Sequence, residues 1–406
     1  MALVVQKYGG SSVADAEKIR NVARRIIKRW ETGDKLVVVV SAMGDTTDDL
    51  LKLARVVSEH PSERELDALV STGELVSSSL VAMALQGMDH PAVSLSGAQA
   101  GIRTDANYSR ARIVNVESSR VTRELDQGKI VIVAGFQGVT SEMDVTTMGR
   151  GASDTTLVAL AASLKADVCE RYTDVEGIYT ADPRIVPDAR SLKDICYDEM
   201  LEVATYGNKV MHPRAIELGA VYNVPIRVRS SFKDSPGTLI HGEVTMEVRN
   251  KVRSIAHDLD VAKIMVVGVP DRPGIAAAIF EPLAKAGISV DTIVQNASIK
   301  NITDLTFTVS RSELGKAMKV VEPIAKSLGA TESVTDAKLG KISIIGTGMQ
   351  NTPGYAARMF KVLSEQNINI QLITTSEIRI TCIIDESRVK DAVAALHKAF
   401  ELDVEG

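Results

Sequence analysis

The sequence predicts an α/β protein in which a mostly parallel sheet sandwiched by helices is followed by two small βαββαβ modules. Three observations lead to this prediction. Apolar, β-branched runs alternate with helical segments in the first part of the chain, which is typical of parallel strands covered on both faces. Glycine-rich turns follow two of these runs, at residues 9–10 and 149–151. Beyond residue 262 the sequence repeats itself eighty positions later.

The composition is that of a soluble globular protein with two or three domains. The chain has 406 residues, 45% hydrophobic and 24% charged, and its net charge of −5 gives no basic surface for nucleic acid. We expect a cytoplasmic protein, because we find no signal peptide and no apolar stretch of the roughly 20 residues that a membrane span needs. The cysteines are too widely spaced for a metal motif or a disulfide framework: Cys169, Cys196 and Cys382.

The first glycine turn predicts an anion site. A strand from Leu3 to Tyr8 leads into Gly9-Gly10, and a helix is expected from Ala14 to Trp30. Unpaired N–H groups at a helix start attract a phosphate, and Lys7 would add a full charge. The spacing is neither that of a P-loop nor that of a dinucleotide fingerprint, so an ordinary turn stays open.

The second glycine loop, Gly149-Arg150-Gly151, opens into a helical run at 157–166. The guanidinium of Arg150 could hold a carboxylate or phosphate through two hydrogen bonds. Asp154, one turn into the helix, could orient a lysine. The alternative is that Ser153 or Asp154 only caps the helix.

Other polar groups follow further apolar segments. Ser41 and the loop 45–49 come at the end of a buried strand, where ligands of parallel sheets bind. Gly73 and Glu74 lie within a long helix, where the glycine allows either the approach of a ligand or helix packing with Glu74 solvated. The segment from Thr173 to Arg184 has aromatic, acidic and basic side chains that suit a nucleotide, although many loops look alike.

The repeat begins where Val267–Gly274 matches Thr347–Gly354. Each copy is expected to form a ferredoxin-like module, and the Pro-Gly pair at its first helix suits the carboxylate of a small ligand. The last major strand before the repeat is expected at 225–229, and 237–250 is expected to form a linker with a hairpin-like segment. We therefore expect a catalytic domain at 1–245, a linker and first strand region at 246–262, and the modules at 263–336 and 337–406.

Phosphoryl transfer suits these residues best. Cations and helix starts are present, but His90 and His212 are not paired with a suitable serine or cysteine, which argues against acyl-transfer hydrolysis. Phosphoryl transfer depends on positioning and charge neutralisation, and a carboxylate acceptor needs no general base.

Four ordered motifs and the repeat resemble the aspartate kinases of the amino-acid-kinase family, with tandem C-terminal ACT domains. The motifs are Lys7–Ser12, Ser71–Glu74, Gly149–Asp154 and Thr173–Arg184. The resemblance implies transfer of the ATP γ-phosphate to the side-chain carboxylate of L-aspartate. The product would be 4-phospho-L-aspartate, the first intermediate towards lysine, threonine and methionine. Two departures, Ser11 for a frequent threonine and Ala152 for a frequent glycine, remove no charge.

The resemblance also implies roles for single residues. The catalytic residues would be Lys7, Asp154, which orients Lys7, and Arg150. Aspartate would be bound by Ser41, Thr47, Glu74, Arg150 and Ser153. ATP with Mg²⁺ would be held by Lys7, Gly9, Gly10, Ser11, Thr173, Asp174, Tyr179, Asp182, Arg184 and Lys209, with no metal site made of protein ligands alone.

Feedback inhibition by lysine, threonine or both is a further implication, with the effector bound where ACT modules meet. The candidate contacts are Asp271, Gly274, Asp291, Thr292, Gln295 and Asn296 in the first module, and Tyr355, Asn369, Ile370, Thr375 and Ser376 in the second; each could instead be a turn or strand residue without a ligand. The chain would form a homo-oligomer, or an α₂β₂ assembly with a regulatory chain that starts at Met246. The alternatives are another amino-acid kinase and a non-catalytic amino-acid sensor with a relic kinase domain.

Overall fold

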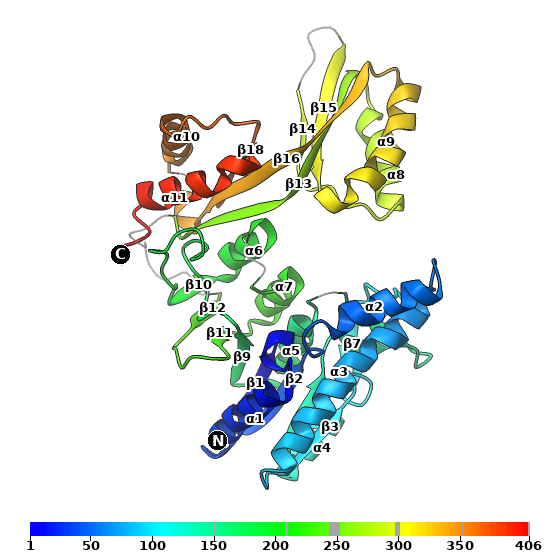
Figure 1. Ribbon diagram of the computed structural model, residues 1–406, viewed down its shortest axis with the longest axis vertical. Helices are drawn as coiled ribbons and strands as arrows, with labels where there is room; N and C mark the ends of the chain where they lie inside the picture. The colour runs from blue at the N-terminus through cyan, green and yellow to red at the C-terminus, as the bar shows by residue number, and fades with distance from the viewer. Residues whose placement is uncertain (150, 208–209, 243–251, 297–300, 351, 405–406) are drawn as a thin grey trace. The chain divides into compact units, whose positions relative to one another are not determined.

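The computed structural model describes residues 1–149, 151–207, 210–242, 252–296, 301–350 and 352–404 (Figure 1). These residues form two compact units. The first comprises Met1–Tyr179, Ser191–Thr205 and Lys209–Met246, and the second comprises Thr180–Arg190, Tyr206–Asn208 and Glu247–Gly406.

An eight-stranded sheet forms the centre of the first unit. Its order is β10 (Asp194–Cys196), β12 (Thr238–His241), β11 (Ile226–Ser230), β9 (Val168–Thr173), β1 (Leu3–Tyr8), β2 (Lys35–Val40), β6 (Ile130–Ala134) and β3 (Ala92–Leu95). From β11 to β3 all neighbours are parallel, as the apolar runs predict. The carboxyl ends of these strands therefore meet at one edge.

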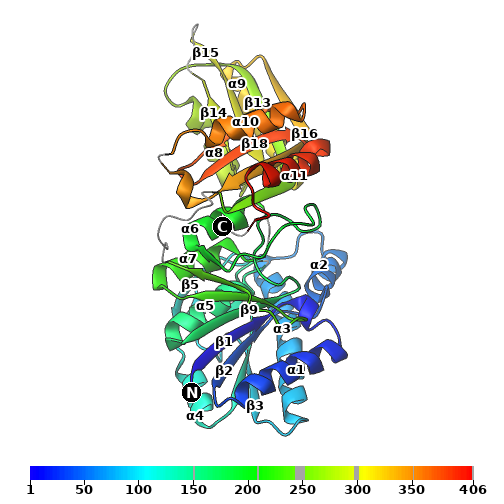
Figure 2. The ribbon, with the colours of Figure 1, turned by 90° about the vertical axis from the view of Figure 1, so that its left-hand side faces the viewer.

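Helices cover both faces of this sheet (Figure 2). Helices α1 (Ala16–Trp30) and α3 (Glu63–Gln86) share a core with Val4 and Tyr8 of β1. Lys7 points to the opposite face, because side chains alternate along a strand, and there it meets α5 (Ser153–Leu164). The remaining helices of this unit are α2 (Thr46–Val57), α4 (Ser119–Asp126), α6 (Tyr197–Tyr206), whose last residue belongs to the second unit, and α7 (Pro213–Tyr222).

A smaller sheet extends the first unit in the order β5 (Ile113–Val116), β4 (Ile102–Thr104), β7 (Gln137–Val139) and β8 (Val145–Thr147). The segment expected to continue as a linker differs from the prediction, because Thr238–His241 is β12 and pairs with β10 and β11. The antiparallel pairing with β11 agrees with the expected hairpin-like segment, whereas the pairing with β10 joins strands far apart in sequence and has no local signal.

Helix α3 also departs from expectation. By length and composition alone it could cross a membrane, although no such apolar stretch was expected. Half of that stretch is buried, however, and Asp67 and Glu74 lie among its buried residues. The helix is therefore best explained as a core helix of this unit.

The second unit is one six-stranded antiparallel sheet. Its order is β14 (Ile293–Gln295), β15 (Ile302–Val309), β13 (Ser254–Pro270), β16 (Glu332–Ile345), β18 (Arg379–Asp385) and β17 (Leu372–Thr375). Figure 1 shows α8 (Ile275–Lys285) and α9 (Leu314–Leu328) side by side against this sheet. Helices α10 (Tyr355–Glu365) and α11 (Val389–Ala399) contribute to a second core. The predicted fold class, with two ferredoxin-like modules, is confirmed.

The two modules are interlocked through their longest strands. The C-terminal part of β13 begins the first module, whereas Ser254–Asp258 of the same strand pair with Lys341–Ile345 of β16. The described residues contain no strand after α11, so residues 254–258 serve as the fourth strand of the second module. Hence the first module is inserted within the second rather than placed before it.

Candidate active site

A buried cluster of three charged side chains joins β1, β9 and α5. Lys7 and Arg171 are register partners on neighbouring parallel strands, so their side chains lie on the same face of the sheet. Lys7 Nζ lies 2.8 Å from Oδ1 of Asp154. The Nε–H of Arg171 donates to both carboxylate oxygens of Asp154 at 3.3 Å. One carboxylate therefore holds two cations, and the backbone N–H of His212 donates to it as well at 3.2 Å.

The protonation of this cluster follows from its burial and its charges. Burial lowers the pKa of Lys7, although Asp154 acts in the opposite direction. Burial alone would raise the pKa of Asp154, but the charges of Arg171 and Lys7 outweigh it and lower that pKa to about 2. With Asp154 ionised and Lys7 protonated, the cluster has a net charge of +1, which suits an anionic ligand.

The start of α1 differs from the predicted anion site. A short 3₁₀ turn at Gly10–Ser12 separates β1 from α1, which begins only at Ala16. The Asp15 carboxylate caps this helix by accepting from the N–H of Lys18 at 2.9 Å. The glycine turn therefore does not open directly into a helix, and any anion at the turn meets the residues of the 3₁₀ turn instead.

The start of α5 has no such cap. Its N-cap residue, Ala152, makes no side-chain cap hydrogen bond. Ser153 accepts a hydrogen bond from the hydroxyl of Ser41 at 3.1 Å, and Asp154 binds Lys7. Neither side chain acts as the N-cap, so the helix start can interact with an anionic ligand. Gly151 has a φ of +82°, which explains a glycine in this loop.

A cavity of about 240 Å³ lies between this helix start and α3. It brings together four of the residues predicted to bind a substrate: Ser41, Thr47, Glu74 and Ser153. The cavity is also lined by Gly10, which was predicted to bind ATP, and by Ala42, Gly44, Asp45, Asp48, Phe136 and Gly151.

Glu74 places a buried carboxyl group at this cavity. Its Oε1 accepts from the backbone N–H of Ala42 at 3.0 Å, while its buried Oε2 has no partner among the described residues. Burial raises the pKa of Glu74 to about 8, although the bond from Ala42 and the charge of Lys7 partly offset this. The unpartnered oxygen is suited to accept from the ammonium group of a ligand.

Gly73 is explained by packing rather than by the approach of a ligand. A Cβ at Gly73 would lie 2.9 Å from the Cβ of Ala42. The neighbouring Glu74 is 3% exposed, so it is not solvated as the packing alternative assumed. The close approach of α3 to the Ala42 backbone is what places the Glu74 carboxylate against that N–H group.

The predicted nucleotide residues are divided between the two units. Thr173 donates to Asp174 at 2.9 Å at the end of β9, and Tyr179 ends the same part of the first unit. Asp182 and Arg184 belong to the second unit, where Arg184 Nη2 donates to Asp182 at 2.7 Å. Gly9 and Ser11 flank Gly10 at the 3₁₀ turn, whereas Arg150 and Lys209 lie outside the described residues.

Two charged residues of the site, the half-buried Arg171 and the buried Asp67, have no counterpart in the sequence-based prediction. Asp67 accepts from the N–H groups of Ser109 and Thr147 at 2.8 and 2.7 Å, and from the hydroxyl of Thr147 at 2.6 Å. It therefore fixes the strand that leads into the second glycine loop. Its spacing of seven residues from Glu74 places both carboxylates on one helix face, and this spacing was the available signal.

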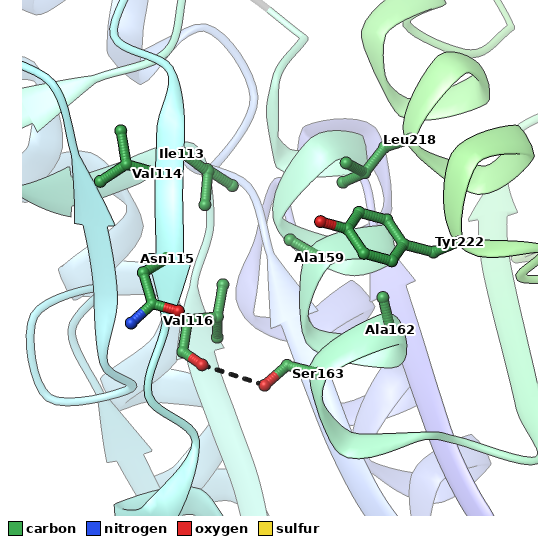
Figure 3. Close-up of a pocket in the computed structure, with 9 residues that line it drawn as sticks. All are labelled: Ile113, Val114, Asn115, Val116, Ala159, Ala162, Ser163, Leu218 and Tyr222. Carbon is green, nitrogen blue, oxygen red and sulfur yellow. Dashed lines mark hydrogen bonds between the residues drawn. The ribbon is translucent and has the colours of Figure 1, made fainter.

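A second cavity of the first unit, about 260 Å³, lies between β5 and the helices α5 and α7 (Figure 3). The hydroxyl of Ser163 donates to the carbonyl of Val116 at 3.1 Å within it. It has no charged side chain, so it is not suited to phosphate chemistry; its lining residues are Ile113, Val114, Asn115, Val116, Ala159, Ala162, Ser163, Leu218 and Tyr222.

The candidate effector residues occupy equivalent places in the two modules. In each module, some of these residues lie at the start of the first helix, where Gly274 and Gly354 are the N-caps. The others lie at the strand that follows this helix. Those strands, β14 and β17, are the two edges of the sheet. Asp291, Thr292, Gln295 and Asn296 therefore lie in or near one edge strand, and Asn369, Ile370, Thr375 and Ser376 in or near the other. Asp271, Gly274 and Tyr355 lie at the starts of the first helices.

Comparisons with known proteins agree with this architecture. Residues 2–230 match the amino acid kinase family, and residues 263–325 and 342–400 each match the ACT domain. An aspartokinase of Mycolicibacterium smegmatis is 50% identical over 99% of this chain and 97% of its own length. An aspartate kinase of Pseudomonas putida is 49% identical over 99% of this chain and 98% of its own.

Solved structures of aspartate kinases are also similar to this chain. The aspartate kinase from Synechocystis is 43% identical, with a TM-score of 0.55 over 100% of this chain and 70% of that one. Aspartokinase III of E. coli, solved with aspartate and ADP, has a TM-score of 0.80 over 98% of this chain and 99% of its own. Its 24% identity supports the fold alone.

Proposed function

The chain belongs to the amino acid kinase family, and from this premise we propose that it is an aspartate kinase. It transfers the γ-phosphate of ATP to the side-chain carboxylate of L-aspartate and gives 4-phospho-L-aspartate, the first intermediate towards lysine, threonine and methionine. The observation that carries the proposal is the cavity in which Glu74 faces the uncapped start of α5. Its size and its separated charges suit a small amino acid.

The proposed roles follow from the charges that line the site. The free oxygen of Glu74 accepts from the ammonium of aspartate, and the start of α5 with Arg150 binds the α-carboxylate. Ser41, Thr47 and Ser153 complete the cavity. This binding orients the side-chain carboxylate as the acceptor.

Lys7 stabilises the negative charge that spreads over the transferring phosphoryl group, and Asp154 orients Lys7. An ionised carboxylate is already a nucleophile, so no side chain has to remove a proton. Catalysis then depends on fixed charges, as the buried cluster provides.

ATP is proposed to bind with Mg²⁺ through Gly9, Gly10, Ser11, Thr173, Asp174, Tyr179, Asp182, Arg184 and Lys209. Among the described residues no group of three histidine, cysteine or acidic side chains could enclose a metal, whereas Asp174 is exposed at the end of β9. This donor set suits Mg²⁺, which is usually held by phosphates, waters and one or two carboxylates. When bound, the ion neutralises phosphate charge.

Regulation and assembly are proposed on the ACT modules. We propose that lysine, threonine or both bind at the candidate effector residues, and that the cytoplasmic protein is a homo-oligomer or an α₂β₂ assembly. Met246, where a shorter regulatory chain would start, lies outside the described residues. A single band of full-length mass from native expression would contradict the α₂β₂ form.

The test is ATP turnover with aspartate and glutamate in parallel, with the acyl phosphate trapped by hydroxylamine. We expect hydroxamate from aspartate and little from glutamate, because one added methylene enlarges the ligand in a small cavity. Addition of lysine and threonine tests inhibition in the same assay. Absence of hydroxamate from aspartate would reject the proposed activity.

A further inference from the structure

We propose that Arg171 is a positioning residue for phosphoryl transfer and that it acts by sharing the carboxylate of Asp154 with Lys7. The inference rests on the proposed function and deepens it. Arg171 neutralises part of the Asp154 charge, so the Lys7 ammonium is held in place and still attracts phosphate. The cluster thus works as two cations on one carboxylate rather than as a closed ion pair.

Strand register carries the first step. Lys7 and Arg171 are direct partners in the parallel pair β1–β9, and each is flanked by residues that point to the other face. On that other face Tyr8 and Tyr172 stack with ring centroids 4.7 Å apart. Because of this alternation, Arg171 must project towards α5 at the level of Lys7, where Asp154 accepts from both.

A purely structural role explains Arg171 poorly. Its side chain is 11% exposed, and its buried Nη1 has no hydrogen-bond partner among the described residues. A buried donor without a partner is unfavourable, and more so when it is charged. An apolar side chain on β9 would avoid that cost, so the guanidinium is better explained by its effect on Asp154 and Lys7.

The groups around Lys7 decide its charge. Burial has the largest effect and lowers the pKa of Lys7, as does Arg171 on β9, whereas Asp154 on α5 and Glu74 on α3 raise it. His212, at the start of α7, reaches the cluster through its N–H group, and burial lowers the pKa of its ring. Removing Arg171 therefore leaves one lysine facing one carboxylate, with a higher pKa for Lys7 and no net positive charge in the cluster.

The experiment measures the affinity for Mg-ATP as a function of pH by calorimetry, together with kcat, for Arg171→Met and Arg171→Lys. Arg227→Met is the matched control, because Arg227 lies on the adjacent strand β11 and its Nη1 donates to the carbonyl of Pro236, nine residues away in the sequence. We expect Arg171→Met to bind ATP about tenfold more weakly and to lower kcat about tenfold, less than the loss of a direct donor.

The pH profile separates positioning from packing. In Arg171→Met the alkaline loss of ATP affinity should move to higher pH, because Lys7 keeps its proton longer. Arg171→Lys should restore both the affinity and the profile, and Arg227→Met should match the wild type. A lower melting temperature for Arg171→Met with an unmoved profile and unchanged affinity would overturn the inference.

The failure of the proposed function is a separate result. A wild-type protein that binds ATP without forming hydroxamate from aspartate would contradict the activity alone. The ATP affinities would still support or reject the role of Arg171.

Discussion

Each unit contains a buried lysine that pairs with an aspartate, Lys7 in the first and Lys341 in the second, and these two pairs differ in what surrounds the carboxylate. In the first unit Asp154 is 3% exposed in its side chain and holds both Lys7 and Arg171. In the second unit Lys341 pairs with Asp291, whose side chain is 28% exposed. The Nζ of Lys341 also lies 5.8 Å from the ring centroid of Tyr206.

The difference in exposure between the two carboxylates indicates which of the two ion pairs is held rigidly. Separating Lys7 from Asp154 would leave a charge buried in the sheet face, so the catalytic pair is fixed by its surroundings. Asp291 can turn to water, and Lys341 has an aromatic ring as a second partner. The carboxylate of the second unit's pair can therefore move while Lys341 stays buried beside the ring, which suits a region proposed to bind effectors.

Asp154→Asn should have the largest effect, because it leaves two cations side by side in the interior. We expect the free energy of unfolding to fall by about 3–5 kcal/mol and activity to be lost. The pKa of Asp154, about 2, lies below its ordinary value of 3.8. Its contribution is thus present above pH 3.8 and lost as the pH falls towards 2. Urea denaturation at pH 7 and pH 3 measures both.

Two outcomes would contradict this view of the first unit. One is an Asp154→Asn variant as stable as the wild type at pH 7. The other is a double variant, Asp154→Asn with Arg171→Met, that is no more stable than the single one, although it removes one of the unpaired cations.

Lys7→Met should abolish turnover and spare the fold. Asp154 keeps Arg171 as a partner in this variant, so no charge is left unpaired. We expect kcat to fall at least about 10²-fold, as for loss of a direct transition-state contact, with a melting temperature close to that of the wild type. Hydroxamate assays and thermal denaturation check the two parts. Near-normal activity would show that Lys7 does not serve the phosphoryl group.

Glu74→Gln tests a buried carboxyl group that forms no ion pair within the described part of the chain. We expect the KM for aspartate to rise about tenfold or more, because a charged hydrogen bond is worth about 1.5–3 kcal/mol. Since Glu74 has a pKa of about 8, the wild type should bind aspartate better as the pH rises through 8, and the variant should not. An equal KM and an equal pH profile would argue against this role.

The same residue predicts an opposite trend in stability without aspartate. A raised pKa means that the folded chain keeps a proton that the unfolded chain loses, so wild-type stability falls between pH 4.5 and about 8. Glu74→Gln should lack this decrease. Melting temperatures across that range measure the difference.

Lys341→Met should have the smallest effect on stability, within about 1 kcal/mol, since Asp291 can be solvated. We expect unchanged turnover without effectors and weaker inhibition by lysine or threonine. Lys338→Met is the control, because Lys338 is exposed on the same strand β16. Strong destabilisation by Lys341→Met would show that this pair is as rigid as the first.

Local patterns were enough to predict much of this molecule. The apolar runs predicted β1 and β2, and the repeat predicted two modules, because both signals lie within short stretches. The start of α1 was missed although Asp15 is a common capping residue followed by a helical pattern. The four described substrate candidates share one cavity because loops of parallel strands meet at one edge.

The remainder depends on pairings between distant residues. Nothing around Arg171 shows which face of β9 it occupies, because that depends on its register with Lys7 in another strand. The pairing of β12 with β10 and the interlocked modules likewise follow from strand pairs far apart in sequence.

The interlocked strands delay the completion of the second unit's sheet during synthesis. Residues 254–258 leave the ribosome well before Lys341–Ile345, the partners that complete their sheet. Until then they form an unpaired edge, which is prone to pair with other chains. A fragment that begins at residue 263 would lack this strand altogether, whereas one that begins at Met246 would include it. A fragment of the second unit must therefore begin before residue 254, because this strand belongs to the second module although it precedes the first in sequence.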